Sequence, residues 1–531
     1  MSNEELRSES RRRPFFARTW NFELRTSPIG LYAVLAVLVF PVFPHFVSPN
    51  ELSRWALAAA IVEDHSLEIS RYVQLLGGGR FEDVAERDGH LYSNKAPGAA
   101  LIGLPGYVIA RLIVGPPSPS NIRATLTAMR FAAATLPLLA LAWMVARTAR
   151  RLRSPLDRTR VAITILLFAT PLFAYGLLNF SHALTAFALF GAWALLFVDP
   201  SPRRDVVAGA LIGLAVISEY TTAIVCAVLI LVAWRRAHRI IVGGIPFALL
   251  LAAYDYVAFG SVFSLSTASE RYAPLRKLVG TGLFGIGVPD MGGALRQLFD
   301  PARGLFVFSP VLLMALIGIW RMRRVLTGSA WITLILAPLS LLILFSGYPN
   351  WHGGWNVGPR YIVPVVPFVA IGLAFVAASW IESLLAGASI VAVALASLTF
   401  PFPDVSFAIP WQTLGVPLLR DGLVAPNALH LVARPLAIAV PFALVLIAAL
   451  GLQKRWFVLG GAVLMLALSA VLIQMRPPSL TQRLRVGYIE EVYFERRGAM
   501  RRALPPGAPI PPSAIARAQS ESALPPSSWP F

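Results

Sequence analysis

Apolar runs about 20 residues long recur along most of this chain, and a bilayer-spanning helix needs runs of that length. Lipid offers the backbone no hydrogen-bond partner, so spanning segments are helices or closed barrels. The 531 residues are 56% hydrophobic and only 14% charged, too little charge for an ordinary soluble enzyme. We predict an all-α polytopic membrane protein with about 13 transmembrane helices.

Basic residues predict the orientation of this bundle, because Lys and Arg collect in cytoplasmic segments. The arginine-rich head, residues 1–27, is therefore predicted to be cytoplasmic. If Ala96–Gly115 spanned the membrane, the arginines from Arg147 to Arg160 would lie outside, so we predict that this Pro- and Gly-broken run lies at the interface or re-enters. The net charge of +19 is then mainly a topology signal, and no nucleic-acid partner is expected.

The predicted organisation follows from this alternation. A transmembrane domain covers residues 28–475, and its large first external loop, residues 48–123, contains juxtamembrane helices. Further external loops cover residues 258–303 and 347–361. The tail, residues 476–531, is predicted to be external and partly disordered because its end is rich in Pro, Ser and Ala.

The first external loop is acidic, which a solvated loop also allows. Glu51 differs in position, because it opens an apparent helix (SRWALAAAIVE) just beyond the first apolar run. A carboxylate fixed there could act as a general base or orient an acceptor hydroxyl. Asp64 and Asp83 are the later carboxylates that could take this role.

In this Asn50-Glu51 pair the sequence resembles the glycosyltransferase C superfamily, especially its protein O-mannosyltransferase and aminoarabinose-transferase-like branch. Members typically carry an Asp-Glu pair at this point, so here the resemblance implies Glu51, with Asp83 and Asp64 as alternatives, as the catalytic carboxylate. Arg54, three residues further on, is expected to contact substrate.

A second motif with the same resemblance runs from Asp88 to Gly98 (DGHLYSNKAPG) and contains His90, Tyr92 and Lys95. We expect Lys95 as a point charge and His90 as a hydrogen-bond donor to contact a phosphate, with Tyr92 contacting substrate. An interfacial anchor with a snorkelling Lys95 is the alternative.

Two further groups are expected on the same side. Arg130 lies inside an apolar run, where a guanidinium is costly, so it should meet Glu51 or a donor phosphate; Arg123 is the shallower alternative, and a structural ion pair is the other interpretation. The resemblance also places an Arg at this point. Glu219 and Tyr220 join two short apolar runs at the external face and are predicted to contact substrate.

The unusual stretch from Tyr348 to Tyr361 adds Trp351, His352, Trp355 and Arg360. The tryptophans suit the walls of a sugar or polyprenyl site, and Arg360 suits a phosphate. An aromatic belt at the interface is the alternative. No metal-ligand spacing and no nucleotide-binding glycine motif is present, so we expect no cofactor; a divalent cation is not supported.

Together with the resemblance, these features predict a membrane glycosyltransferase of the bacterial inner membrane. It would transfer a sugar from a polyprenyl-phosphate donor to a glycan, lipid or protein acceptor on the external, periplasmic face. A transporter or flippase of a lipid-linked substrate is the main alternative, and a scaffold without catalysis is a third.

Overall fold

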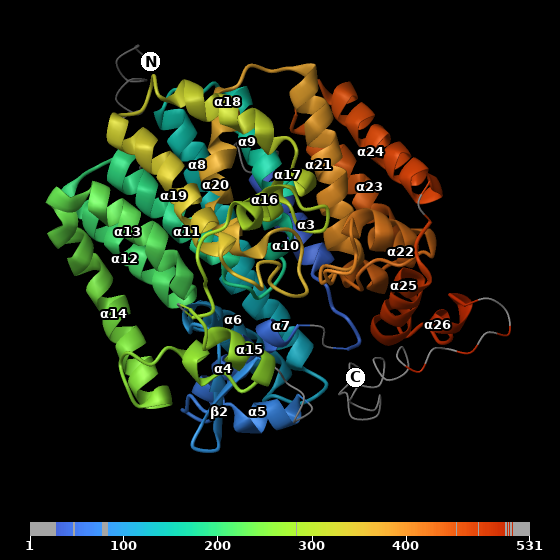
Figure 1. Cartoon of the computed structure of the whole chain (residues 1–531), viewed down its shortest axis with the longest axis horizontal. Helices are drawn as coiled ribbons and strands as arrows, with labels where there is room; N and C mark the ends of the chain where they lie inside the picture. Colours follow the sequence, from blue (N-terminus) through green and yellow to red (C-terminus); the bar gives the residue numbers. More distant parts are fainter. Residues whose placement is uncertain are drawn as a thin grey trace, which may run out of the picture.

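A computed structural model describes residues 28–45, 48–76, 83–282, 284–452, 454–475 and 477–504, with three isolated positions beyond. The predicted cytoplasmic head and most of the Pro- and Ser-rich end of the tail lie outside these residues. The described chain is a helical bundle with a smaller cap of helices and a hairpin at its lower end (Figure 1).

The cap is built from the segment that follows the first helix, α3 (Pro28–Val39). Pro49 at the start of α4 presets the helical φ angle, and Gly115, at a φ of 85°, ends α6. Helices α4 and α6 pack against each other, and α6 packs along α7. The elements of the cap are α4 (Pro49–Glu63), α5 (Ser70–Leu75), β1 (Val84–Arg87), β2 (His90–Ser93), α6 (Gly98–Val114) and α7 (Ile122–Arg130).

The hairpin departs from the all-α prediction. Strands β1 and β2 are antiparallel, and their register runs from the pair Val84 and Ser93 to the pair Arg87 and His90. Asp88 and Gly89 form the turn at φ angles of 52° and 82°. Asp-Gly is a preferred pair for a two-residue turn that needs two positive φ angles, and this local preference produces strands in an otherwise helical chain.

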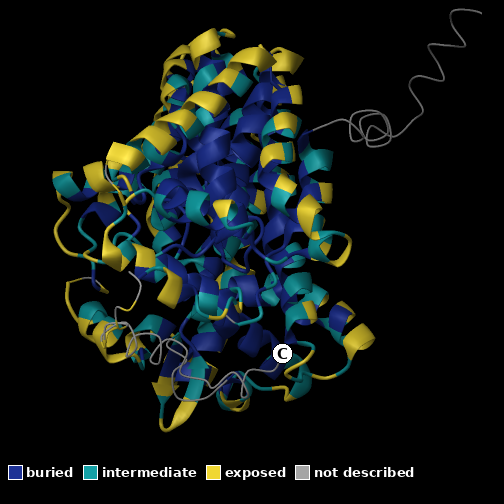
Figure 2. Cartoon of the chain, turned by 90° about the vertical axis from the view of Figure 1, so that its right-hand side faces the viewer, coloured by how far each residue is buried: buried dark blue, intermediate teal, exposed yellow. Residues whose placement is uncertain are grey.

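The bundle is densely packed at its centre (Figure 2). Buried apolar side chains such as Leu138, Phe168, Trp193 and Phe368 join its helices into one core. Helices α12 and α14 approach closely, because a Cβ on Gly209 would lie 1.9 Å from the carbonyl oxygen of Ile240. The helices in the first half of the bundle are α8 (Leu136–Arg151), α9 (Leu156–Phe168), α10 (Leu172–Tyr175), α11 (His182–Trp193), α12 (Pro202–Ser218), α13 (Ala223–Val232) and α14 (Ala237–Phe259).

The remaining helices complete the bundle and end in the folded part of the tail. Tyr493 and Phe494 pack with Phe43 and Phe400, so the first part of the tail is docked on the bundle. These helices are α15 (Ala273–Val279), α16 (Met291–Phe299), α17 (Leu305–Phe308), α18 (Leu312–Met322), α19 (Gly328–Ser346), α20 (Val366–Ala370), α21 (Trp380–Thr399), α22 (Val416–Arg420), α23 (Arg434–Leu450), α24 (Arg455–Met475), α25 (Leu480–Tyr493) and α26 (Ala499–Arg502).

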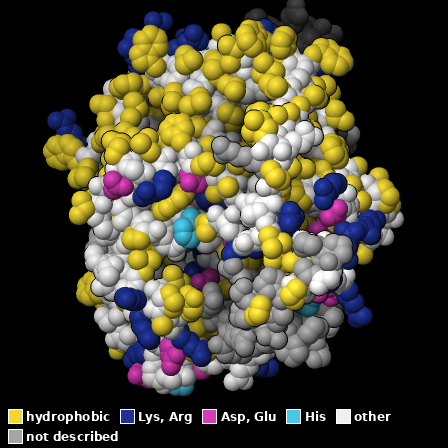
Figure 3. Space-filling view, turned by 45° about the vertical axis from the view of Figure 1, so that its right-hand side comes forward, with side chains coloured by type: hydrophobic (Ala, Val, Ile, Leu, Met, Phe, Trp, Pro, Cys, Tyr) yellow, Lys and Arg dark blue, Asp and Glu magenta, His cyan; other side chains and the backbone are white. Residues whose placement is uncertain are grey.

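Five helices of the described chain are long and apolar enough to cross a membrane. They are Ile122–Arg151, Trp234–Phe259, Gly328–Ser346, Trp380–Thr399 and Arg455–Met475. Several shorter apolar helices accompany them, including Gly98–Val114, which covers the predicted non-spanning run. On the face drawn in Figure 3, hydrophobic side chains cover the upper half, and charges of both signs gather in the lower half. The chain is a multi-pass membrane protein, and the predicted count of about 13 spans is not confirmed.

Candidate functional site

Glu51 and Arg130 form a buried ion pair where the cap meets the bundle. The Arg130 Nε and Nη2 atoms donate to the two carboxylate oxygens of Glu51, both at 2.8 Å. A third donor is the backbone N–H of Asn179, 2.6 Å from Glu51 Oε1, and Arg130 Nη1 donates to the carbonyl of Pro41. The side chains are 3% and 7% exposed, so this charge pair depends on its internal partners.

Local structure places both partners. Glu51 lies in the first turn of α4, where the N-terminal end of the helix dipole favours a negative charge. Arg130 is the last residue of α7 and precedes a π-helical turn, Phe131–Thr135, before α8 continues. Such turns are frequent at functional sites, because they shift the helix face by one residue.

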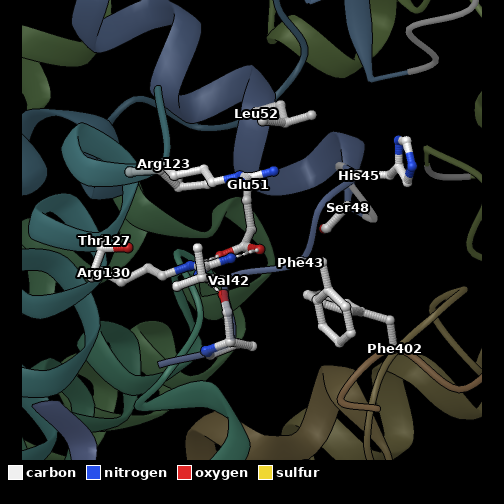
Figure 4. A pocket seen from close by; sticks show the side chains of 12 residues that line it. Val42, Phe43, His45, Ser48, Glu51, Leu52, Arg123, Thr127, Arg130 and Phe402 are labelled. Atoms are coloured by element: carbon white, nitrogen blue, oxygen red, sulfur yellow. Dashed lines mark hydrogen bonds and ion pairs between the residues drawn. The ribbon is translucent and has the colours of Figure 1, made fainter. Parts of the chain in front are cut away.

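A small pocket opens beside this pair, and we call it the Glu51 pocket (Figure 4). Arg123 contributes a second guanidinium, which donates to the carbonyl of Pro44 at 2.8 Å. Burial lowers the pKa of His45, and Arg123 adds to this effect while Glu495 opposes it. The complete lining is Pro41, Val42, Phe43, His45, Ser48, Glu51, Leu52, Arg123, Leu126, Thr127, Arg130 and Phe402.

The polar turn Asn179–His182 connects the ion pair to other predicted site residues. Besides the Asn179 N–H on Glu51, the Ser181 hydroxyl donates to Glu219 Oε2 at 2.9 Å and accepts from Arg54 Nη2 at 3.4 Å. The Arg360 guanidinium lies over the Phe180 ring, 4.9 Å from its centroid. One turn of chain therefore gathers residues from the first loop, α12 and the 347–361 loop.

Arg54 is fully enclosed in this group. Its Nη1 atom donates to the carbonyl of Asn50 at 3.0 Å and also contacts the Asn50 side-chain oxygen. Burial lowers the pKa of Arg54 to about 10, with Arg360 adding to the shift and Glu219 opposing it. The Asn50 side chain thus orients Arg54, which is a positioning role for the residue at the usual Asp position of the resembled family.

Asp83 and Lys95 form a second ion pair, 2.8 Å apart and with exposed fractions of 15% and 18%. Burial acts to raise the pKa of Asp83, but Lys95, Arg360 and the amide of Asn94 outweigh it, so the pKa lies below its ordinary value. The same Asn94 amide donates to Glu270 at 2.7 Å. Burial raises the pKa of Glu270, so the two carboxyls beside Asn94 are shifted in opposite directions.

Several buried polar atoms of this group have no hydrogen-bond partner among the described residues. They are Asn50 Nδ2, Arg54 Nε, Asn94 Oδ1, both side-chain amide atoms of Asn179, His182 Nδ1 and Arg360 Nε. Buried polar atoms of native proteins are normally paired, so this concentration marks groups that a polar ligand would satisfy.

Other predicted residues lie outside this group. Asp64 caps the far end of α4, where it accepts from Arg71 and Tyr72 at 2.8 and 2.7 Å. It lies about 20 Å along the helix from Glu51, at 1.5 Å per residue. His90 is half-exposed on the hairpin and pairs with Glu68 at 3.1 Å.

The aromatic side chains that were predicted to contact substrate lie in several different places. Trp355 packs on Phe400 and Tyr493 in the aromatic cluster that holds the tail, and Trp351 lies beside His352. Tyr92 packs edge-on against Phe259. Tyr220 is paired with Ser266 at 3.3 Å, next to the Asn94 group.

The His352 ring accepts from the backbone N–H of Gly354 at 3.1 Å, and burial, reinforced by Arg303, lowers its pKa. Arg303 is completely buried. It donates to the carbonyls of Pro403 and Gly354 at 2.6 and 3.4 Å and so holds the 347–361 loop. The polar stretch Asn-Phe-Ser-His between two apolar runs predicts polar groups on this side of the bundle, and it contains Ser181 and His182. Among the described residues, no three His, Cys, Asp or Glu side chains form a group that could hold a metal.

Comparisons with known proteins give matches at the level of structure only. No family model and no curated protein matches the sequence. The crystal structure of ArnT from Cupriavidus metallidurans in the apo state matches with 17% identity and a TM-score of 0.45, over 83% of this chain and 76% of that chain. ArnT from the same organism bound to undecaprenyl phosphate matches with 16% identity and a TM-score of 0.45, over 91% and 81%.

Proposed function

We propose that this protein is a membrane glycosyltransferase that uses a polyprenyl-phosphate sugar donor at the external face of the membrane. The observation that carries the proposal is the Glu51 pocket, which combines a buried carboxylate and two guanidinium groups with apolar walls. A phosphate suits the guanidinium groups of Arg123 and Arg130, and a polyprenyl chain suits walls such as Phe43, Leu126 and Phe402.

The chemistry needs a proton acceptor and a stabilised leaving group. An acceptor hydroxyl attacks the anomeric carbon, the bond from that carbon to the phosphate oxygen breaks, and the lipid phosphate leaves with the electron pair. Arg123 and Arg130 stabilise the charge that grows on this phosphate.

Glu51 is the proposed acceptor of the hydroxyl proton. In the free protein its two oxygens are held by Arg130 and Asn179. A donor phosphate competes with Glu51 for Arg130, and this exchange frees the carboxylate next to the reacting hydroxyl. Asp83, already held by Lys95, is the alternative acceptor.

Packing in the centre of the bundle favours transfer over transport. A transport path would need polar groups through the membrane depth. The helices between the cap and the opposite end of the bundle are packed by buried apolar side chains, including Leu138, Phe168 and Phe368. The proposed site lies at one end of this core, as expected when the lipid brings its head group to the site.

The proposal is tested by transfer of labelled sugar from synthetic polyprenyl-phosphate donors to an acceptor extract, with full-length protein in vesicles. Glu51→Gln is expected to lower transfer by about 100-fold or more, the usual scale for loss of general acid-base catalysis. Asp83→Asn separates the two carboxylates. Asp64→Asn is the matched control, because it neutralises a carboxylate on the same helix about 20 Å from the pocket.

Full transfer by Glu51→Gln and Asp83→Asn would contradict the assigned site. Equal loss in Asp64→Asn would indicate a general effect of charge on the cap. No transfer by the wild type from any donor of a broad panel would contradict the proposed function and favour transport.

A further inference from the structure

A second basic pocket lies at the other end of the helix that carries Arg130. Helices α7 and α8 form one continuous segment, Ile122–Arg151. Arg130 and Arg147 are 17 positions apart, or about 26 Å at 1.5 Å per residue. This distance approaches the hydrocarbon thickness of about 30 Å, as expected for pockets at opposite membrane surfaces.

The pocket is built around one carboxylate, and we call it the Asp199 groove. Arg147 and Arg151 approach Asp199 Oδ2 at 3.2 and 2.9 Å, and Arg204 contacts Oδ1. Three guanidinium groups around one carboxylate leave a net charge of +2. Asp199 is only 15% exposed, whereas the arginines are 32%, 47% and 36% exposed, so the positive groups face outward.

The other wall of the groove is apolar. Met144 of α8 and Ala194, Leu195 and Val198 line a shallow space beside Arg147 and Arg151. The last three residues belong to a π-helical turn, Ala194–Val198, that ends α11 directly before Asp199. A π-helical turn replaces the regular hydrogen bonds of an α-helix with a wider pattern, and such turns are frequent at functional sites. Here the turn forms the apolar wall of the groove.

An exposed tryptophan marks the level of this groove. Trp143 is 45% exposed, and the Arg147 guanidinium lies 5.6 Å from its ring centroid. Trp beside Arg at the end of an apolar helix is typical of the membrane interface. The arginine distribution in the sequence predicts that this end is cytoplasmic.

We propose that the Asp199 groove binds the phosphate head group of an anionic phospholipid of the cytoplasmic leaflet. The guanidinium groups contact the phosphate, and an acyl chain lies along Met144, Leu195 and Val198. Basic pockets between transmembrane helices on the cytoplasmic side are suited to such head groups. The apolar wall distinguishes a lipid from free phosphate, which would leave that wall unused. This inference does not depend on the proposed transferase activity.

Native mass spectrometry of the full-length protein in detergent, titrated with phosphatidylglycerol or phosphatidylcholine, tests the proposal. Wild type is expected to retain phosphatidylglycerol in preference to phosphatidylcholine. A basic residue that contacts an anionic head group contributes about fivefold to its binding, so Arg147→Gln with Arg151→Gln is expected to weaken phosphatidylglycerol binding about 25-fold. Arg151→Gln alone, at the most exposed position, is expected to weaken it about fivefold without disturbing the fold.

Arg323→Gln with Arg324→Gln is the matched control. It removes the same charge from the predicted cytoplasmic side, where both side chains lie over the exposed Trp320. It is expected to change binding by less than about twofold. Equal retention of the two lipids, equal loss in the control, or displacement of the lipid by millimolar inorganic phosphate would each overturn the assignment.

Discussion

Replacing Arg130 by Met leaves the carboxylate of Glu51 buried without its counter-ion. Glu51 loses two of its three hydrogen bonds, and only the N–H of Asn179 remains. Because the Glu51 side chain is only 3% exposed, water does not replace the lost donors. Removing one partner of such a buried pair costs about 3–5 kcal/mol, mostly because the remaining charge is uncompensated.

A double-mutant cycle of Arg130→Met and Glu51→Gln separates the interaction energy of the two side chains from the other effects of each substitution on stability. Each single change leaves a buried partner unpaired, whereas the double change removes both charges. The double variant should therefore be more stable than the sum of the single losses predicts, by about 2 kcal/mol.

The assay is thermal unfolding in detergent, followed by the fluorescence of the 13 tryptophans. At about 2 °C per kcal/mol for a large chain, Arg130→Met should lower the Tm by about 6–10 °C. Arg158→Met is the matched control, because Arg158 and Glu382 form a comparable buried pair, with contacts of 2.8 and 2.5 Å. It should lower the Tm similarly and leave binding of a polyprenyl-phosphate donor unchanged.

A Tm loss below about 2 °C in Arg130→Met would refute the reasoning, because the pair would then not be desolvated. Strict additivity in the cycle would refute the direct contact. Equal loss of donor binding in Arg158→Met would mean that stability, rather than the Glu51 pocket, controls binding.

Three further predictions follow from other contacts. Gly98→Ala should lower the free energy of unfolding by about 1–3 kcal/mol, because the added Cβ would lie 2.3 Å from Ser218 Oγ and 2.8 Å from the Ile217 carbonyl oxygen. Gly328→Ala is the control and should change this free energy little, because its Cβ would meet open space. Ser181→Ala should reduce transfer about tenfold with a small change in Tm, because it disconnects Arg54 from Glu219, whereas Ser340→Ala in α19 should not reduce transfer. Burial raises the pKa of Glu490 from 4.5 to about 7; Asp421 adds to this shift, and Arg496 and Arg502 oppose it. The folded tail therefore binds the proton of Glu490 more tightly than the unfolded chain does. Its stability falls as the pH rises from 4.5 through 7. Limited proteolysis of α25 should therefore accelerate from pH 5 to pH 8 in the wild type and not in Glu490→Gln.

Apolar run length was sufficient to predict the helical membrane bundle, and the charge distribution predicts which end of the bundle carries the site. The cost of an arginine inside an apolar run led directly to the interpretation of Arg130, and Glu51 was one of its two predicted partners. The hairpin was not predicted because each of its strands has only four residues, which is short for an alternating pattern, and the turn preference of Asp88-Gly89 was the local signal for it.

Other parts of the site depend on tertiary contacts that periodicity does not reveal. Asn179 contributes a backbone N–H, which leaves no trace in residue type. Ser181 is one of many serines, and only packing brings it between Arg54 and Glu219. Trp355 and Arg360 lie close in sequence, but Trp355 packs on the aromatic cluster of the tail whereas Arg360 lies over Phe180.

Photo-crosslinking with a polyprenyl phosphate that carries a diazirine next to its phosphate tests the central claim most directly. Labelled peptides should map to residues 41–52, 122–130 and the region of Phe402, and the labelling should fall in Arg130→Met but not in Arg158→Met. Labelling confined to residues 143–151 and 194–199, or distributed along the whole length of the helices, would contradict a donor site in the Glu51 pocket.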